Sequence, residues 1–297
     1  MSKICLLGTG LMGKPMAIRL LQAGHSLTVW NRSPVKAQLL GQQGAQVAPD
    51  AVSAVSGSDV ILSMLSDGPA VRSVMQGVQS ALRPGQLWVD MSSTRQDEAQ
   101  QMHAWLAQFE VLMLDAPVSG GVLGAEHGRL AIMAGGVEAA YAQALPVLRC
   151  FGQPSLVGGP GCGQLAKLCN QLIVGGTLEL VAEALLLAQA GGADPAAVRQ
   201  AIRGGFAESR ILEVHGARML ERNFMPGGQI KSQSKDLDNV LAAARQAGMK
   251  LPLTELVGQR FHALLGHWAH ADQSAALLGL ERDNPGVRLG ASPDRLP

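Results

Sequence analysis

The chain has 297 residues, of which 47% are hydrophobic and 16% charged, and its formal net charge is +1. This composition is typical of a soluble protein of two domains, and the balanced charge argues against nucleic acid as a partner. Because a signal-type N-terminus and an uninterrupted apolar run of about 18 residues are both missing, we expect a cytoplasmic protein with no membrane partner.

The start of the chain predicts a dinucleotide-binding site. A short apolar run at residues 3–8 ends in the sequence GTGLMG at residues 8–13, and a helical pattern follows. Gly8 permits the tight turn, Gly10 lets the backbone approach a pyrophosphate, and Gly13 lets the helix lie close to the strand. The helix N-terminus favours the phosphate charge. The expected cofactor residues of this loop are Gly8, Gly10, Leu11, Met12 and Gly13.

The residues after the second strand indicate which nicotinamide cofactor is favoured. Residues 26–30 predict that strand, and Asn31, Arg32 and Ser33 follow it, where an NAD-preferring site usually has an acidic side chain for the ribose 2′-hydroxyl. No acidic residue stands there, and the guanidinium of Arg32 suits a 2′-phosphate. The alternative is an arginine that only extends into solvent. We expect these three residues to bind NADP, with NAD as the alternative cofactor.

Further apolar segments predict a doubly wound, Rossmann-type parallel sheet, because stretches able to form helices separate them. In such sheets a ligand lies beyond the carboxyl ends of the strands, so the residues after each strand matter most. Those residues are small or polar and can expose backbone N–H groups, although ordinary turn chemistry also explains any one triplet. The expected strands are residues 60–65, 87–91, 112–118 and 130–134, and the triplets are 65–67, 92–94 and 119–121.

A long helix is expected over residues 164–190, which lack proline and carry leucines at helical spacing. Near its start, Lys167 and Asn170 lie three residues apart and therefore on one face. Such a lysine has two interpretations. Its aliphatic stem packs on apolar surface while its ammonium group lies in solvent, or the ammonium group has a function. We expect a dinucleotide-binding domain at residues 1–162 and, joined to it by this helix, a helical domain for substrate binding and dimerisation at residues 163–297.

The rest of the second half contains no evident strand. Its last residues, from about residue 284 onward, are rich in Pro, Gly, Arg and Asp and predict a poorly ordered tail. The four cysteines are scattered without a CxxC pair or a histidine cluster, so we expect reduced thiols and no bound metal. The expected helices are residues 195–203, 209–221, 234–247, 253–267 and 272–280.

Four motifs in order along the chain together resemble the β-hydroxyacid dehydrogenase family. They are GTGLMGKPMA at 8–17, DAPVSGGVLGAEHGRLAIMAGG at 115–136, GCGQLAKLCNQ at 161–171 and KDLDN at 235–239. The resemblance covers nearly the whole chain and implies reversible hydride transfer between NAD(P)H and a short carboxylate-bearing semialdehyde. Within the family, residues 202–228 and 251–257 are most similar to members that reduce tartronate semialdehyde to glycerate. The alternatives are 3-hydroxyisobutyrate dehydrogenation and reduction of succinate semialdehyde or glyoxylate.

The resemblance also implies roles for single residues. Lys167 takes the catalytic place and protonates the developing alkoxide, while Asn170 orients the substrate and the lysine. The substrate carboxylate is held by hydroxyl and backbone donors of the SGG turn. The implied substrate-binding residues are Ser119, Gly120, Gly121 and Gln171, and the further cofactor-binding residues are Leu65, Ser66, Ser93 and Lys235.

One segment departs from the family pattern. Before the KDL sequence the family usually shows apolar residues that cover the cofactor, whereas residues 228–234 of this chain are mostly polar. This change puts closure over the cofactor in doubt. Imine reductases of the family lack the catalytic lysine, so the presence of Lys167 counts against that activity. A non-catalytic dinucleotide-binding scaffold is the alternative from another class. The apolar long helix predicts a homodimer or homotetramer.

Overall fold

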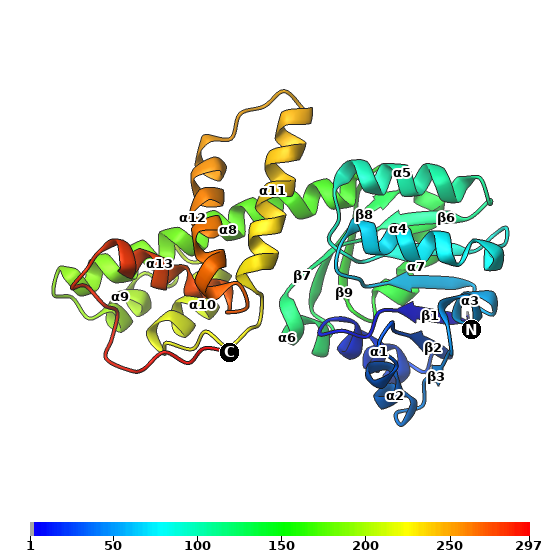
Figure 1. Cartoon of the computed structure of the whole chain (residues 1–297), viewed down its shortest axis with the longest axis horizontal. Coiled ribbons are helices and arrows are strands. Elements are labelled where there is room, and N and C mark those ends of the chain that lie inside the picture. The colour runs from blue at the N-terminus through cyan, green and yellow to red at the C-terminus, as the bar shows by residue number, and fades with distance from the viewer. Residues whose placement is uncertain (1–2) are drawn as a thin grey trace. The chain divides into compact units, whose positions relative to one another are not determined.

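The computed structural model describes residues 3–297 and divides into two compact units, Met1–Lys167 and Leu168–Pro297 (Figure 1). The first unit is built around a sheet, and the second is built of helices. Helix α8 (Cys162–Ala190) begins in the first unit and continues into the second. The expected fold class, a Rossmann-type domain followed by a helical domain, is confirmed.

The strands of the first unit follow the order β3-β2-β1-β4-β5-β6-β8-β7, and β9 pairs with β8. Pairing is parallel from β3 to β6, whereas β8 runs antiparallel to β6 and β7. The carboxyl ends of β1, β4, β5 and β6 therefore meet at one edge of the sheet. The strands are β1 (Ile4–Leu7), β2 (Leu27–Trp30), β3 (Gln46–Val47), β4 (Val60–Ser63), β5 (Leu87–Asp90), β6 (Leu112–Asp115), β7 (Val118–Ser119), β8 (Leu130–Gly136) and β9 (Gly152–Gly158).

The sheet differs from the sequence-based expectation in three ways. The single strand expected over 112–118 is two strands, because Pro117 stands between them and has no N–H for a ladder. The sheet is mainly parallel, as expected, but β8 runs antiparallel to β6. Strand β9 was not expected, since Gly152 and Pro154 weaken its strand pattern; its alternate residues are exposed.

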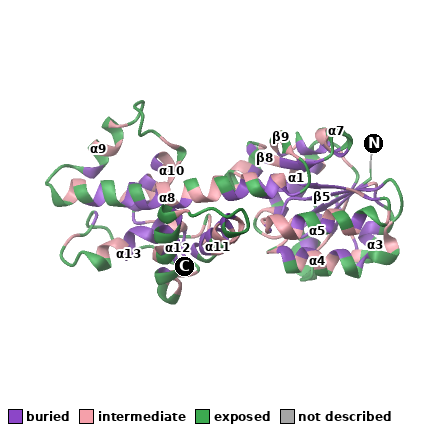
Figure 2. Cartoon of the chain, turned by 90° about the horizontal axis from the view of Figure 1, so that it is seen from above, coloured by how far each residue is buried: buried purple, intermediate pink, exposed green. Residues whose placement is uncertain are grey.

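Two apolar cores lie on opposite faces of the sheet. Along β1, Ile4 and Leu6 belong to one core while Cys5 and Leu7 belong to the other, because successive side chains point to opposite faces. Helices α1 (Gly13–Gln22) and α7 (Glu138–Leu148) cover the first face, and α3 (Ala51–Ser56), α4 (Gly68–Gly77) and α5 (Gln96–Ala107) cover the second. Figure 2 shows helices α1 and α7 on one side of the sheet and α4 and α5 on the other. The remaining helices of this unit are α2 (Pro34–Gly41), η1 (Gln79–Ala81) and α6 (Gly121–Glu126).

The second unit has a core of its own. The buried face of α8 contributes Leu178, Ala182 and Leu185, and Phe261 of a neighbouring helix and Phe224 of a connecting segment belong to the same core. The helix expected from residue 234 begins four residues earlier, so residues 230–234 of the polar segment before KDL are helical. The expected helix over 272–280 is a 3-10 turn followed by a helix. The helices are α9 (Pro195–Ala201), α10 (Arg210–Leu220), α11 (Ile230–Gln246), α12 (Pro252–Trp268), η2 (Gln273–Ala275) and α13 (Ala276–Asp283).

By length and composition alone, α8 is the one helix in residues 3–297 that could cross a membrane. The core helix of a globular domain meets the same criterion. Glu179 of α8 is 4% exposed and forms an ion pair with Arg260 of α12 at 2.6 Å, while its neighbours Leu178 and Ala182 are fully buried in the helical core. These contacts are those of a core helix.

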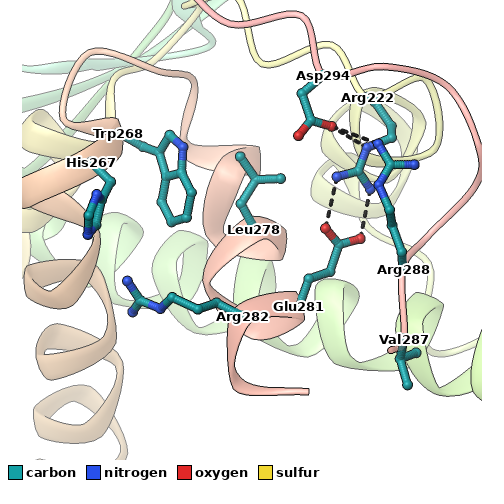
Figure 3. A pocket seen from close by; sticks show the side chains of 9 residues that line it. All are labelled: Arg222, His267, Trp268, Leu278, Glu281, Arg282, Val287, Arg288 and Asp294. Atoms are coloured by element: carbon teal, nitrogen blue, oxygen red, sulfur yellow. Dashed lines mark hydrogen bonds and ion pairs between the residues drawn. The ribbon is translucent and has the colours of Figure 1, made fainter. Parts of the chain in front are cut away.

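The prediction of a poorly ordered tail from residue 284 was wrong. That segment forms part of an ion-pair cluster around the buried Arg222 side chain (Figure 3). The Arg222 side chain is 1% exposed, bonds both carboxylate oxygens of Glu281 at 2.7 and 2.8 Å, and also pairs with Asp294. Leu289 is fully buried, and its carbonyl accepts from Arg222. A charged residue of this segment, Asp294, thus takes part in an ion pair.

Candidate functional site

The glycine loop after β1 has the shape of a phosphate cradle. Gly8 has φ +103°, and a Cβ there would lie 2.3 Å from the carbonyl oxygen of Met64. A Cβ on Gly13 would lie 2.0 Å from the carbonyl oxygen of Gly8, so α1 can approach the loop only with glycine at this position. A Cβ on Gly10 would meet no heavy atom of the described residues within 4 Å. The space beside Gly10 is therefore open, as a ligand phosphate requires.

Within residues 3–297, no side chain caps the first turn of α1. Met12 is its N-cap residue and makes no capping hydrogen bond, so the N–H groups of the helix start suit an anion. Asn31 at the end of β2 accepts a hydrogen bond from the backbone N–H of Thr9 at 3.0 Å and fixes the loop. The buried Thr9 hydroxyl has no partner in residues 3–297. Leu11 is 69% exposed.

Arg32 and Ser33 lie on the surface beside this loop. Within residues 3–297 the Arg32 guanidinium makes no hydrogen bond or ion pair, and the Ser33 side chain does not cap α2. The side-chain amide of Asn31 donates instead to the Ser33 carbonyl at 3.0 Å. An unpartnered guanidinium beside a phosphate cradle fits the 2′-phosphate of NADP. The residues present therefore suit the nicotinamide cofactor.

A buried carboxyl group connects the loops after β4 and β5. Asp90 is fully buried, and its Oδ1 accepts hydrogen bonds from the hydroxyls of Ser63 at 2.8 Å and Ser92 at 2.7 Å. The Ser92 hydroxyl oxygen also accepts the backbone N–H of Leu65 at 2.9 Å. Burial raises the pKa of Asp90 to about 6, and its Oδ2 has no partner in the described chain. Asp90 thus supports the loops that contain the expected residues Leu65, Ser66 and Ser93.

The N-terminus of α8 is held by a second buried carboxylate. Asp115, at the end of β6, accepts the backbone N–H of Gly161 at 2.8 Å and that of Gln164 at 2.8 Å. A Cβ on Gly163 would lie 2.2 Å from the Asp115 carbonyl oxygen, so the helix touches the sheet at this glycine. Gly161 has φ +83°. The glycines of the sequence GCGQ therefore allow α8 to begin against the strand ends.

Lys167 lies one turn after these contacts and is 8% exposed. This burial favours the interpretation in which the Lys167 ammonium group has a function over the one in which it lies in solvent. Ser119 of the same unit is half-buried, and the glycines that follow it have φ +134° and +64°. These angles explain why Gly120 and Gly121 stand in the SGG turn.

In the second unit, the expected residues Asn170, Gln171 and Lys235 are linked by hydrogen bonds and an ion pair. The side chain of Gln171 accepts from Asn170 at 2.8 Å and donates to Asp236 at 2.7 Å. Lys235 pairs with Asp236 at 3.4 Å. Gln233, which is 1% exposed, accepts from Gln171 at 3.1 Å and donates to its backbone carbonyl at 2.9 Å. Part of the unusual polar segment therefore serves to hold Gln171.

The loop that leads into α11 is fixed by Asp272. This buried carboxylate accepts the backbone N–H groups of Gly227 and Gly228, each at 3.0 Å, and contacts the His215 ring at 3.2 Å. Burial acts to raise its pKa, but the bonds from His215, Gly228 and Ser274 outweigh burial and hold the pKa well below its usual range. Asp272 therefore sets where α11, with Lys235, begins.

Sequence reasoning missed Asp90, Asp115, Gln164, Gln233 and Asp236. Asp90 and Asp115 each end an apolar strand, a position where a charged residue is unusual, and this signal could have singled them out. No comparable local signal marks the two glutamines. No group of three His, Cys, Asp or Glu residues in the described chain could hold a metal ion.

Comparison with known proteins gives consistent matches over both units. Residues 3–169 match the NAD-binding domain of 6-phosphogluconate dehydrogenase, and residues 161–280 match the NAD-binding domain of NADP-dependent 3-hydroxyisobutyrate dehydrogenase. The chain is 42% identical to the 2-hydroxy-3-oxopropionate reductase of Escherichia coli (strain K12) over 94% of its own length and 97% of that protein.

Two solved structures have the same fold. The Mycobacterium tuberculosis 3-hydroxyisobutyrate dehydrogenase with L-serine has a TM-score of 0.88 at 31% identity, covering 94% of this chain and 99% of that one. Psf3 in complex with NADP+ and 2-OPP has a TM-score of 0.85 at 26% identity, covering 93% of this chain and 99% of that one. Both similarities extend over the sheet unit and the helical unit.

Proposed function

The chain belongs to the β-hydroxyacid dehydrogenase family and is an NAD(P)-dependent oxidoreductase, and from this premise we propose that it reduces tartronate semialdehyde to glycerate with NADPH. The observation that carries the proposal is Lys167, a nearly buried lysine on α8, in a chain 42% identical to a 2-hydroxy-3-oxopropionate reductase. A lysine so placed has a chemical use in this reaction, because the reduced aldehyde needs a proton.

The roles of the residues follow from the chemistry of the substrate. When bound, the nicotinamide cofactor supplies the hydride. Lys167 donates a proton from Nζ to the alkoxide oxygen that forms at the former carbonyl. The Ser119 hydroxyl and the backbone N–H groups of Gly120 and Gly121 bind the carboxylate, and Asn170 with Gln171 orients the hydroxyl groups. A substrate without the carboxylate leaves these donors unpaired and reacts more slowly.

A second candidate is 3-hydroxyisobutyrate dehydrogenation, and a specific similarity favours it. The Mycobacterium tuberculosis enzyme of that name shares 31% identity with this chain, and its structure contains L-serine, itself a short 3-hydroxy acid. The two candidates differ at carbon 2, where tartronate semialdehyde has a hydroxyl and methylmalonate semialdehyde a methyl group. The polar side chains of Asn170 and Gln171 favour the hydroxyl compound.

A panel of substrates tests the proposal. Purified protein is assayed for NADPH and NADH oxidation with tartronate semialdehyde, methylmalonate semialdehyde, succinate semialdehyde, glyoxylate and propanal. We expect the highest kcat/KM with tartronate semialdehyde and NADPH, and a far lower value with propanal. A higher kcat/KM for methylmalonate semialdehyde would replace the first candidate with the second. Equal rates for propanal and for the carboxylate-bearing aldehydes would contradict the proposal that the protein recognises a carboxylate.

We also propose that the protein forms a homodimer or homotetramer through the outer face of α8. Ile173, Leu180 and Leu187 are 64%, 60% and 73% exposed and are spaced seven residues apart, so they form one apolar stripe. A second copy of the chain would remove this stripe from water. We expect Leu180→Glu to lower the mass measured by sedimentation velocity, whereas Glu183→Gln on the same helix leaves it unchanged. An unaltered assembly in Leu180→Glu would contradict this interface.

A further inference from the structure

We propose that Gln164 and Asp115 are positioning residues for Lys167, which hold the helix carrying the lysine and the loop after β5 on one buried framework. This inference rests on the proposed role of Lys167 as the proton donor. Neither residue needs to touch substrate or cofactor, because both act by fixing where the first turns of α8 lie.

Asp115 anchors the start of the helix. Its two carboxylate oxygens accept N–H groups from Gly161 and Gln164, each at 2.8 Å, and the side chain is fully buried. A carboxylate beside a helix N-terminus is favoured by the helix dipole. Because the carboxylate belongs to β6, these bonds fix the N-terminus of α8 to the sheet rather than to its own preceding residues.

Gln164 joins the same turn to the loop that follows β5. Its Oε1 accepts the backbone N–H of Thr94 at 3.0 Å, and its Nε2 donates to the backbone carbonyl of Ser92 at 2.8 Å. The side chain is fully buried, and its acceptor and donor are both used. These bonds bracket Ser93, one of the residues expected at the nicotinamide. Residue 167 lies three positions after Gln164, on the same face of the helix.

The geometry therefore links two parts of the proposed site that lie 70 residues apart in sequence. A change in the Gln164 bonds displaces the loop around Ser93, the turn before Lys167, or both. Hydride and proton transfer depend on the alignment of these parts, and a misplacement of about 1 Å can lower a rate by about 10²-fold. Loss of the framework should thus lower kcat more than it raises the KM for semialdehyde.

Gln86 offers a matched control in the same unit. It is also a fully buried glutamine, and its side chain bonds the Ser58 carbonyl at 2.8 Å and the Arg83 N–H at 2.9 Å. It precedes β5, at the amino end of the strand, whereas Gln164 acts at the carboxyl end. Replacement of either glutamine by leucine removes comparable buried hydrogen bonds and should lower thermal stability to a similar extent.

The experiment compares Gln164→Leu and Gln86→Leu with the unaltered protein. We expect Gln164→Leu to lower kcat on the order of 10- to 100-fold and to displace the kcat–pH profile, with NADPH affinity changed far less, whereas Gln86→Leu keeps kcat within about twofold. A Gln164→Leu protein that loses stability like the control but keeps its kcat and pH profile would overturn the inference. If Gln164→Leu does not fold, Gln164→Glu replaces it. That variant keeps the acceptor for Thr94 but can donate to Ser92 only when protonated, so its deficit should shrink as pH falls.

A measurement without turnover separates this inference from the proposed function. Competitive acetylation of lysines, followed by mass spectrometry across a pH series, reports the reactivity of Lys167 in the cofactor-free protein. We expect its profile to change in Gln164→Leu and not in Gln86→Leu, with Lys36 as an internal reference on the surface. Unchanged Lys167 labelling in Gln164→Leu would refute the positioning role even if the semialdehyde reaction is established. A changed profile in a protein that reduces no semialdehyde would refute only the proposed function.

Discussion

The buried Asp90 carboxyl should make the stability of this protein depend on pH in a way that one substitution removes. Burial raises its pKa from the usual 3.8 to about 6, and Asp115 adds a like charge nearby. The folded state therefore binds a proton more tightly than the unfolded chain does. The contribution of Asp90 to stability is fully present below pH 3.8 and is lost as the pH rises through about 6.

The magnitude follows from the two pKa values. Each pH unit between them corresponds to about 1.36 kcal/mol, so ionisation of Asp90 costs about 3 kcal/mol of unfolding free energy when complete. Between pH 4.5 and pH 7.5 the change amounts to about 2 kcal/mol, because the group already titrates in part at the lower pH. Asp90→Asn keeps an oxygen for the hydroxyls of Ser63 and Ser92 but cannot ionise.

Urea unfolding at several pH values, for the unaltered protein and for Asp90→Asn, measures this effect. The other titrating groups cancel when the two curves are subtracted at each pH. We expect Asp90→Asn to be destabilised at pH 4.5, because its amide places unpaired N–H groups in the core, and to gain about 2 kcal/mol relative to the unaltered protein by pH 7.5. A difference between the two proteins that is constant with pH would refute a raised Asp90 pKa.

Three further expectations concern the other parts of the chain. Lys167→Ala should lower turnover by roughly 10²-fold or more while NADPH still binds in a fluorescence titration; near-normal turnover of the folded variant would exclude Lys167 as the proton donor. Arg32→Ala should reduce the preference for NADPH over NADH by about tenfold to a hundredfold in kcat/KM, and an unaltered preference would contradict its contact with the 2′-phosphate. Asp294→Ala should lower the thermal midpoint by leaving Arg222 with one fewer ion pair, and an unchanged midpoint would show that the Arg222–Asp294 pair contributes nothing to stability.

Local patterns in the sequence were sufficient for the framework of the molecule. The strand before Gly8, the glycines at 8, 10 and 13, and the apolar periodicity of α8 each specify structure through neighbours a few residues away. The family resemblance added the dehydrogenase activity, and this activity is confirmed together with the fold class and the nicotinamide cofactor. The roles given to Lys167 and Asn170 stay predictions.

The tertiary structure decided what the sequence could not, because the deciding contacts join residues far apart in the chain. Nothing in the local sequence distinguishes Gln164 from the other glutamines. Its role follows from its hydrogen bonds to the backbone of Thr94 and Ser92, which only the fold brings next to it. The C-terminal segment has a composition typical of disorder, yet it is held by Arg222, which bonds Asp294, 72 residues later, and the carbonyl of the buried Leu289. A buried polar group requires a partner, and only the fold determines which residue supplies it.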